Sequence, residues 1–333
     1  LSYGELANKA VDMPIPESPL LKTKGEYKYI GTELARHDLS MVVQGERKYG
    51  VDTKLHGMKY AAIIHCPVYG GKLKSLDKSA ALAMKGVIDV IEITPIKMPF
   101  SSLGGVAVVA DNSWTAQQGV KLLKVEWDKG PHGDYDTKQY RQMLVNNVEK
   151  PAKLIAKRGD VDKAFEQAQS KVSATYTGGH LCHAPMEPNA SVVSVTNDSC
   201  EVWASTQSPA DIQKVLANYL GRKPKDIIVH VMISGGAFGR KFKCDYVHEA
   251  AVISNTIKAP VQLIWSREED MRTGFYHSIS AQHIEASLDD KGNVSGWLHR
   301  AAFPAINTLF NPALKRAPKS TFRDINPHPF FIK

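Results

Sequence analysis

The feature that most constrains this chain is a predicted strand that runs directly into a glycine-rich loop and then into a helix. Apolar residues predict the strand at 226–233, the loop is Gly235-Gly236-Ala237-Phe238-Gly239, and small residues at helical spacing predict the helix at 245–258. Glycines let backbone N–H groups approach a ligand closely. Because Arg240 and Lys241 follow at once, we expect the loop to receive an anion such as a pyrophosphate or a metal-bound oxo group.

Spacing alone leaves other interpretations of this loop open. A phosphate-binding P-loop is disfavoured because no Ser or Thr follows Lys241. A tight turn without any ligand explains the glycines about as well when the loop is considered by itself. The interpretation of the loop therefore depends on the rest of the sequence.

The chain as a whole predicts an α+β protein with two domains. Its 333 residues and 43 % hydrophobic content are sufficient to bury two cores. Residues 1–55 are polar, with three early prolines, and predict a linker or wrapping arm. We expect a small α/β domain at 56–128, a linker at 129–158, an α+β domain at 159–305 and a basic tail at 306–333.

Within the small domain, four strands alternate with two helices. Ser75 is the expected cap of a short helix that ends near Met84, and Gly86 stands where a left-handed residue closes a helix. The predicted strands are 59–65, 87–93, 105–111 and 122–127, and the second helix is 112–119.

In the second domain, cap residues mark the helix starts. Asp160 is the expected cap of one helix, and Ser208, followed by Pro209, is the expected cap of another that ends at Gly221. Besides 226–233, the predicted strands are 171–177, 191–196, 200–205, 261–265, 278–288 and 294–303.

Charge and cysteine content narrow the classes of function. The net charge is +8, but about half of the excess lies after residue 306, and no basic stripe with interleaved aromatics occurs elsewhere, so we expect no nucleic-acid partner. No run of about 18 apolar residues predicts a transmembrane segment. The four cysteines lack CxxC spacing, so we expect buried single thiols, and any iron–sulfur cluster on another chain.

Linked motifs surround the glycine loop. Residues 203–207 (WASTQ) precede it and residues 265–271 (WSREEDM) follow it, and in order and separation the set resembles the molybdenum hydroxylase large subunits of the xanthine oxidase/aldehyde oxidoreductase superfamily. Together with 183–188 (HAPMEP), the variant FGRK is most similar to isoquinoline oxidoreductase and membrane-associated aldehyde dehydrogenase subunits. Residues 69–77 and 108–114 look like the hammerhead domain of that family.

The resemblance covers residues 1–303 and implies a hammerhead-type α/β domain followed by part of the molybdopterin-binding α+β domain, that is, a fragment of a large subunit. It implies a molybdenum–molybdopterin cofactor, in its cytosine dinucleotide form, with the amides near Phe238 and Gly239 facing an apical oxo ligand. No side chain is expected to bind the metal directly. The expected cofactor-binding residues are Gly235, Gly236, Ala237, Phe238, Gly239, Arg240 and Gln207. For Gln207, a buried side chain that bridges two strands is an equally good interpretation.

The resemblance also bears on the substrate. Tyr276 and Phe242 replace an arginine and a glutamate of purine-oxidising members, which favours an aldehyde or a neutral N-heteroaromatic substrate. The expected substrate pocket consists of Phe238, Phe242, Tyr276 and His277, with ordinary core aromatics as the alternative. Glu187 is expected to pair within the fold. The family's base, a glutamate near the C-terminal end, has no counterpart after Glu285, so no catalytic residue is assigned and the chain alone is expected to be inactive.

The resemblance further implies partners. These are a small-molecule substrate, the remainder of the large subunit, an iron–sulfur subunit that removes electrons, and, as a further candidate, a cytochrome. The residues say nothing about the compartment, and only analogy favours the periplasm. Two alternatives stay open: a non-catalytic module that keeps the fold without the metal, and a phosphate or nucleotide binder that uses the glycine loop.

Overall fold

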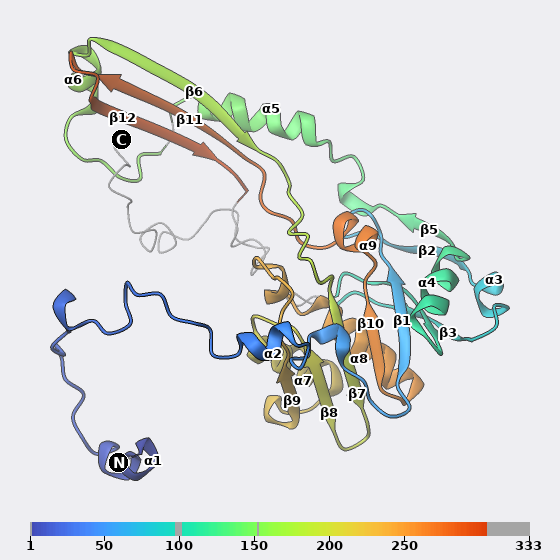
Figure 1. Ribbon diagram of the computed structural model, residues 1–333. Helices are drawn as coiled ribbons and strands as arrows, with labels where there is room; N and C mark the ends of the chain where they lie inside the picture. Colours follow the sequence, from blue (N-terminus) through green and yellow to red (C-terminus); the bar gives the residue numbers. More distant parts are fainter. Residues whose placement is uncertain (1, 97–101, 152, 305–333) are drawn as a thin grey trace. The chain divides into compact units, whose positions relative to one another are not determined.

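The computed structural model describes residues 2–96, 102–151 and 153–304, so the predicted basic tail lies outside the described residues (Figure 1). The chain divides into two compact units, Leu1–Arg47 and Lys48–Lys333. The first unit contains α1 (Tyr3–Ala10), η1 (Lys24–Glu26) and α2 (Leu39–Val43). Its α1 buries no residue, which agrees with the polar character that predicted a linker or arm.

A seven-stranded sheet forms the centre of the second unit, in the order β3-β4-β1-β10-β7-β8-β9 (Figure 1). Its strands are β3 (Val87–Ile93), β4 (Gly105–Ala110), β1 (Lys59–Ile64), β10 (Val261–Ile264), β7 (Ala190–Val195), β8 (Cys200–Ala204) and β9 (Ile227–Val231). β1 and β10 pair in parallel, with Lys59 opposite Val261. Strands expected in two domains therefore share one sheet, and the boundary between those domains stays a prediction.

Successive side chains of β1 point to opposite faces of this sheet, and both faces are buried. Ala61 and Ile63 belong to the core that includes α8 (Asp245–Ile257) and α7 (Pro209–Leu220). Ala62 lies in a separate cluster with Ala116 of α4 (Ser113–Lys121). Helices thus pack on opposite faces, which explains why every residue of β4 is buried.

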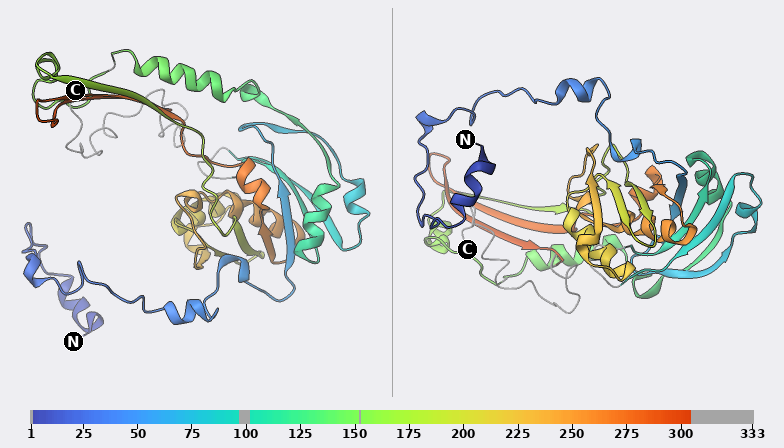
Figure 2. Two further views of the ribbon diagram at one scale, coloured as in Figure 1. Left: turned by 45° about the horizontal axis from the view of Figure 1, so that its top comes forward. Right: turned by 90° about the horizontal axis from the view of Figure 1, so that it is seen from below.

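A three-stranded sheet, in the order β12-β11-β6, joins β6 (Ser170–Gly178), β11 (Ser280–Leu288) and β12 (Val294–Ala302). The helix α5 (Thr137–Val148) packs on it through Leu144 and Val148, and lies along it in both views of Figure 2. The segment 129–158 was expected to be a linker, so this helix is a correction: its buried positions, four residues apart, form one helical face.

The small sheet of β2 (Lys72–Asp77) and β5 (Lys124–Asp128) corrects the prediction for Ser75. Ser75 lies within β2, and the helix α3 (Ser79–Leu82) begins only after it, with Asp77 accepting the N–H of Ser79 at 3.0 Å. Leu73 and Leu76 are spaced as in a helix, but a β-bulge between Leu73 and Ser75 turns both toward the core.

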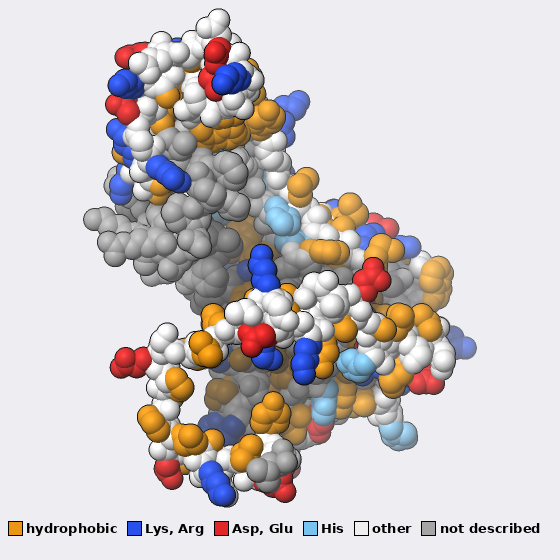
Figure 3. Space-filling model, turned by 60° about the vertical axis from the view of Figure 1, so that its left-hand side comes forward, with side chains coloured by type: hydrophobic (Ala, Val, Ile, Leu, Met, Phe, Trp, Pro, Cys, Tyr) orange, Lys and Arg blue, Asp and Glu red, His pale blue; other side chains and the backbone are white. Residues whose placement is uncertain are grey.

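Of the other cap predictions, those for Asp160 and Gly221 are confirmed. Ser208 stands at the N-cap position but its side chain makes no cap hydrogen bond, and α3 already ends at Leu82, before Gly86. Asp160 caps α6 (Val161–Glu166), Pro209 is the first residue of α7, and Gly221 ends that helix at φ +66°. The remaining elements are α9 (Arg267–Arg272), η2 (Gly50–Asp52), η3 (Gly130–His132), η4 (Pro224–Asp226) and η5 (Arg240–Phe242). No described helix is long and apolar enough to cross a membrane. Lysine and arginine side chains are dispersed among acidic and hydrophobic ones on the face shown in Figure 3.

Candidate functional site: the glycine loop

The glycine loop follows β9 and leads into η5 and α8, which confirms the predicted strand–loop–helix order. Gly236 and Gly239 have φ angles of +99° and +92°, which glycine adopts without penalty. Phe238 also has a positive φ, +54°, which costs a residue with a side chain about 1–2 kcal/mol. Because this conformation is unfavourable locally, the surroundings of the loop must hold it.

Backbone donors of the loop are available to a ligand. Within the part of the chain that the structure describes, no hydrogen bond uses the N–H groups of Gly236, Ala237 or Phe238. The N–H of Gly239 donates to Oε1 of Gln207 at 3.1 Å. The Phe238 side chain is 70 % exposed, so the loop presents consecutive donors near the surface, an arrangement that favours an anion.

Gln207 lies beside the loop, as predicted for a residue of this site. Its side chain is exposed, which contradicts the alternative of a buried glutamine that bridges two strands. Its own N–H donates to the carbonyl of Lys241 at 3.0 Å. Gln207 therefore contacts both Gly239 of the loop and Lys241, which follows the loop.

The two cations after the loop are each paired with a buried carboxylate, which corrects the expectation that they add uncompensated positive charge beside the amides. Arg240 donates two hydrogen bonds to Asp245, at 2.9 and 2.7 Å, and both side chains are buried. Lys241 donates to Oε2 of Glu187 at 2.6 Å, and burial lowers the pKa of its ammonium although Glu187 acts to raise it. A direct cofactor contact by Arg240 stays a prediction, but its charge is already compensated.

The pairing expected of Glu187 is confirmed. Besides Lys241, its carboxylate accepts the N–H of Gly235 at 2.9 Å. A Cβ at Gly235 would lie 2.5 Å from the Cβ of Glu187, so only glycine permits this approach.

The predicted substrate-pocket residues are exposed in the second unit. Phe238, Phe242 and Tyr276 are each at least 36 % exposed, which contradicts the alternative of ordinary core aromatics. Tyr276 donates its hydroxyl to the carbonyl of Met271 at 3.1 Å. His277 packs on His183, with ring centroids 4.3 Å apart. Whether these residues line a substrate pocket stays a prediction.

His183 was not assigned to the site from the sequence. Its Nε2 would lie 3.8 Å from a Cβ at Gly239, which places the ring beside the loop. Burial, with His277, Arg240 and Lys243 nearby, lowers the pKa of His183 to about 4, so its imidazole is neutral at pH 7. The HAPMEP motif drew attention to the segment, but no spacing in it indicated this contact.

A second buried cluster lies behind Arg240. The guanidinium carbon of Arg240 is 5.2 Å from the ring centroid of Trp265, and the ring of His65 also packs on Trp265, with the two ring centroids 4.3 Å apart. His65 contacts Glu269 at 2.9 Å and Glu249 at 3.1 Å. Burial acts to lower the pKa of His65, but the two carboxylates outweigh it and raise that pKa to about 9.

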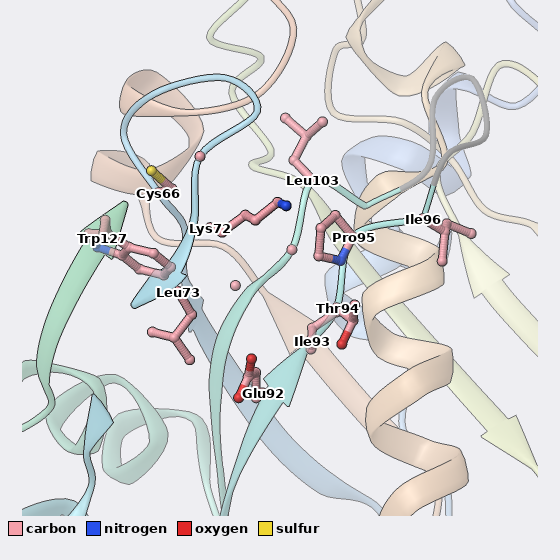
Figure 4. Close-up of a pocket in the computed structure, with 13 residues that line it drawn as sticks. Cys66, Lys72, Leu73, Glu92, Ile93, Thr94, Pro95, Ile96, Leu103 and Trp127 are labelled. Atoms are coloured by element: carbon pink, nitrogen blue, oxygen red, sulfur yellow. The ribbon is translucent and has the colours of Figure 1, made fainter. Parts of the chain in front are cut away.

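A cavity of about 400 Å³ lies elsewhere in the second unit (Figure 4). Its lining includes Cys66, Lys72, Glu92 and Trp127, and includes none of the glycine-loop residues. The glycine loop therefore does not line this cavity. Among the described residues, no group of three or more His, Cys, Asp or Glu side chains is arranged to hold a metal ion.

Comparison with known families shows which kind of domain contains the loop. The family described as the molybdopterin cofactor-binding domain matches residues 145–303, which include the whole loop and its anchors Glu187 and Asp245. Residues 145–303 form a molybdopterin cofactor-binding domain. This confirms the resemblance stated from the motifs around the loop.

Named relatives of the molybdopterin domain agree. The chain is 30 % identical to isoquinoline 1-oxidoreductase subunit beta of Brevundimonas diminuta, over 81 % of this chain and 35 % of that one. It is 29 % identical to a membrane-bound aldehyde dehydrogenase [pyrroloquinoline-quinone] of Gluconacetobacter polyoxogenes, over 85 % of this chain and 37 % of that one. The chain thus spans little more than a third of the length of these relatives.

Solved structures share the fold. Quinoline 2-oxidoreductase from Pseudomonas putida 86 superposes with a TM-score of 0.62 at 19 % identity, over 82 % of this chain and 39 % of that one. At this identity the likeness extends to the fold alone. The α/β architecture described above is therefore similar to the fold of this oxidoreductase.

Proposed function

We propose that the glycine loop holds the molybdopterin cofactor of an oxidoreductase. The observation that carries the proposal is the set of backbone donors at Gly236, Ala237 and Phe238, which no described residue uses. They fit an anionic group because they are consecutive and lie near the surface. When bound, the molybdenum centre supplies the oxidising chemistry.

In this proposal the residues of the protein position and hold the cofactor. The amides of Gly236–Phe238 donate to an oxo or phosphate oxygen, and Gln207 lies next to them through Gly239. Arg240 and Lys241 stabilise the loop through their buried ion pairs with Asp245 and Glu187. Phe238, Phe242, Tyr276 and His277 are the surface from which a substrate pocket would be built, for an aldehyde or an N-heteroaromatic compound.

The wider assignments belong to the same proposal. Residues 56–128 would be the hammerhead-type domain and 159–305 part of the molybdopterin domain. The cofactor would take the cytosine dinucleotide form, and electrons would pass to an iron–sulfur partner. Support comes from the names of the relatives, which include an isoquinoline oxidoreductase subunit and an aldehyde dehydrogenase.

Elemental analysis of the natively purified protein, with any chains that accompany it, tests the proposal. About one molybdenum per complex, with an extractable pterin, is the expected result, and the mass of the complex would reveal the partner chains. Because the name of one relative includes pyrroloquinoline quinone, the extract is also assayed for that quinone. A quinone without molybdenum in a properly folded complex would refute the proposal.

A phosphate or nucleotide binder is the second candidate, because the same N–H groups, which no described residue uses, would donate to phosphate oxygens. Thermal unfolding with and without nucleotides distinguishes the two. A ligand that binds only the folded state raises the unfolding temperature. Stabilisation by a nucleotide in protein free of molybdenum would favour this candidate.

A further inference from the structure

One buried carboxylate ties together the two ends of the glycine loop. Oε2 of Glu187 accepts the N–H of Gly235, which opens the loop, at 2.9 Å, and the ammonium of Lys241, which follows it, at 2.6 Å. The backbone N–H of Glu187 also donates to the carbonyl of Gly235 at 3.0 Å. The loop is therefore closed at its base by a single residue that precedes it by 48 positions.

We call the contacts of Glu187 with Gly235 and Lys241 the clamp. The other carboxylate oxygen of Glu187 adds further contacts to it. Oε1 accepts the N–H of Val51 at 3.3 Å and lies 3.3 Å from the Ser205 hydroxyl oxygen. Ser205 directly follows β8, and its hydroxyl donates its one proton to the carbonyl of Ile233, just before the loop, at 2.7 Å. The carboxylate thus fixes the loop to the end of the central sheet.

From these contacts we infer that Glu187 is a positioning residue that sets the glycine loop for its ligand, and that Lys241 is the counter-ion of Glu187 rather than a contact for the ligand. The clamp itself follows from the described contacts; the identity of the ligand rests on the proposed function. Lys241 is fully buried, so its ammonium cannot meet a ligand at the surface.

The strain within the loop gives the clamp its importance. Phe238 adopts a positive φ that it would leave if the loop were free. Removing one partner of a buried ion pair leaves the other charge uncompensated. Loss of either Glu187 or Lys241 should therefore release the loop, whereas replacing both by neutral side chains should largely keep it.

The test is hydrogen exchange of the full chain, free of cofactor, in three variants. Glu187→Gln keeps an acceptor near Gly235 but places an amide group against the ammonium, and Lys241→Met leaves the carboxylate unpaired. Each single variant should speed exchange of the Gly235 N–H by roughly tenfold or more, with the amides of β7 unchanged. The double variant Glu187→Gln/Lys241→Met should return the rate to within about threefold of the original protein.

Glu201→Gln is the matched control, because Glu201 forms an exposed pair with His230 and should leave loop exchange unaltered. If the single variants do not fold, the double variant decides alone: slow exchange at Gly235 supports the clamp, and fast exchange overturns it. A Lys241→Met variant with unchanged exchange but lost molybdenum would also overturn it, since Lys241 would then act on the ligand. Absence of molybdenum from the original protein would count against the proposed function only.

Discussion

Arg240 donates two hydrogen bonds to Asp245, at 2.9 and 2.7 Å, and so links the end of the glycine loop to the first turn of α8. Both side chains are buried. The ring of Trp265 lies 5.2 Å from the guanidinium carbon. The pair therefore belongs to the protein interior, where each charge depends on the other.

Breaking this pair should destabilise the second unit strongly. We expect Asp245→Asn to lower the free energy of unfolding by about 3–5 kcal/mol, because Arg240 would stay buried without the carboxylate that accepts its two hydrogen bonds. Urea denaturation measures the change. The control is Glu126→Gln, whose pair with Lys74 has side chains 66 % exposed, and which should change stability by less than about 0.5 kcal/mol. Equal effects of the two substitutions would refute the expectation.

Phe238→Gly should leave stability unchanged or raise it by up to about 1.5 kcal/mol. The substitution removes a left-handed backbone cost of about 1–2 kcal/mol and adds the larger chain entropy of glycine, about 0.5–1 kcal/mol. Little packing is lost, because the ring is mostly exposed. Thermal unfolding gives the comparison with Phe242→Gly, where φ is not positive and a loss of about 1 kcal/mol is expected. A destabilised Phe238→Gly would show that the ring packs on something.

Local signals in the sequence predicted most elements of the fold. Cap residues fixed the starts of α6 and α7, and alternating or continuous apolar runs marked the strands of the central sheet. The sequence misled at Ser75, since a β-bulge imitates helical spacing between Leu73 and Leu76. Parallel pairing of β1 with β10 has no local signal, because the partners lie far apart in the chain.

For the site, the sequence located the loop and Gln207 but misjudged the charges. Arg240 and Lys241 were expected to face an anion, and instead each is neutralised from within. Asp245, at the start of the next helix, could have been considered as a partner from its proximity in sequence. Glu187 precedes Lys241 by 54 positions, so only the fold could show that the two meet.

Stability should fall as the pH rises from about 6.5 to 9. The pKa of His65 is about 9 in the folded protein, against 6.5 for the free side chain, because Glu249 and Glu269 stabilise its cationic form. Its contribution, about 3 kcal/mol, is fully present below pH 6.5 and is lost as the pH passes through 9. Urea denaturation across this range tests it. In His65→Gln the slope should disappear, and an unchanged slope would assign it to another group.

Two of the four cysteines should react in the native protein. All four are free thiols; the expectation that all are buried is wrong for Cys66 and Cys182, which are partly exposed. Burial raises the pKa of Cys200 to about 11 and that of Cys244 to about 12, so these thiols should stay unmodified until the protein unfolds. Titration with a thiol reagent at pH 8, followed by peptide mass spectrometry, identifies the modified residues. Early labelling of Cys200 or Cys244 would contradict the described burial.

The pairing of Lys59 with Val261 also sets the order in which this protein can fold on the ribosome. β1 finds β4 soon after synthesis, but its other edge waits for a strand that begins 202 residues later (261 minus 59). At roughly 5–20 residues per second, that interval lasts about 10–40 s. During this interval the nascent chain has an unpaired strand edge, and Ala61 and Ile63 are not yet buried. We therefore expect chaperones to bind mainly to the early half of the chain.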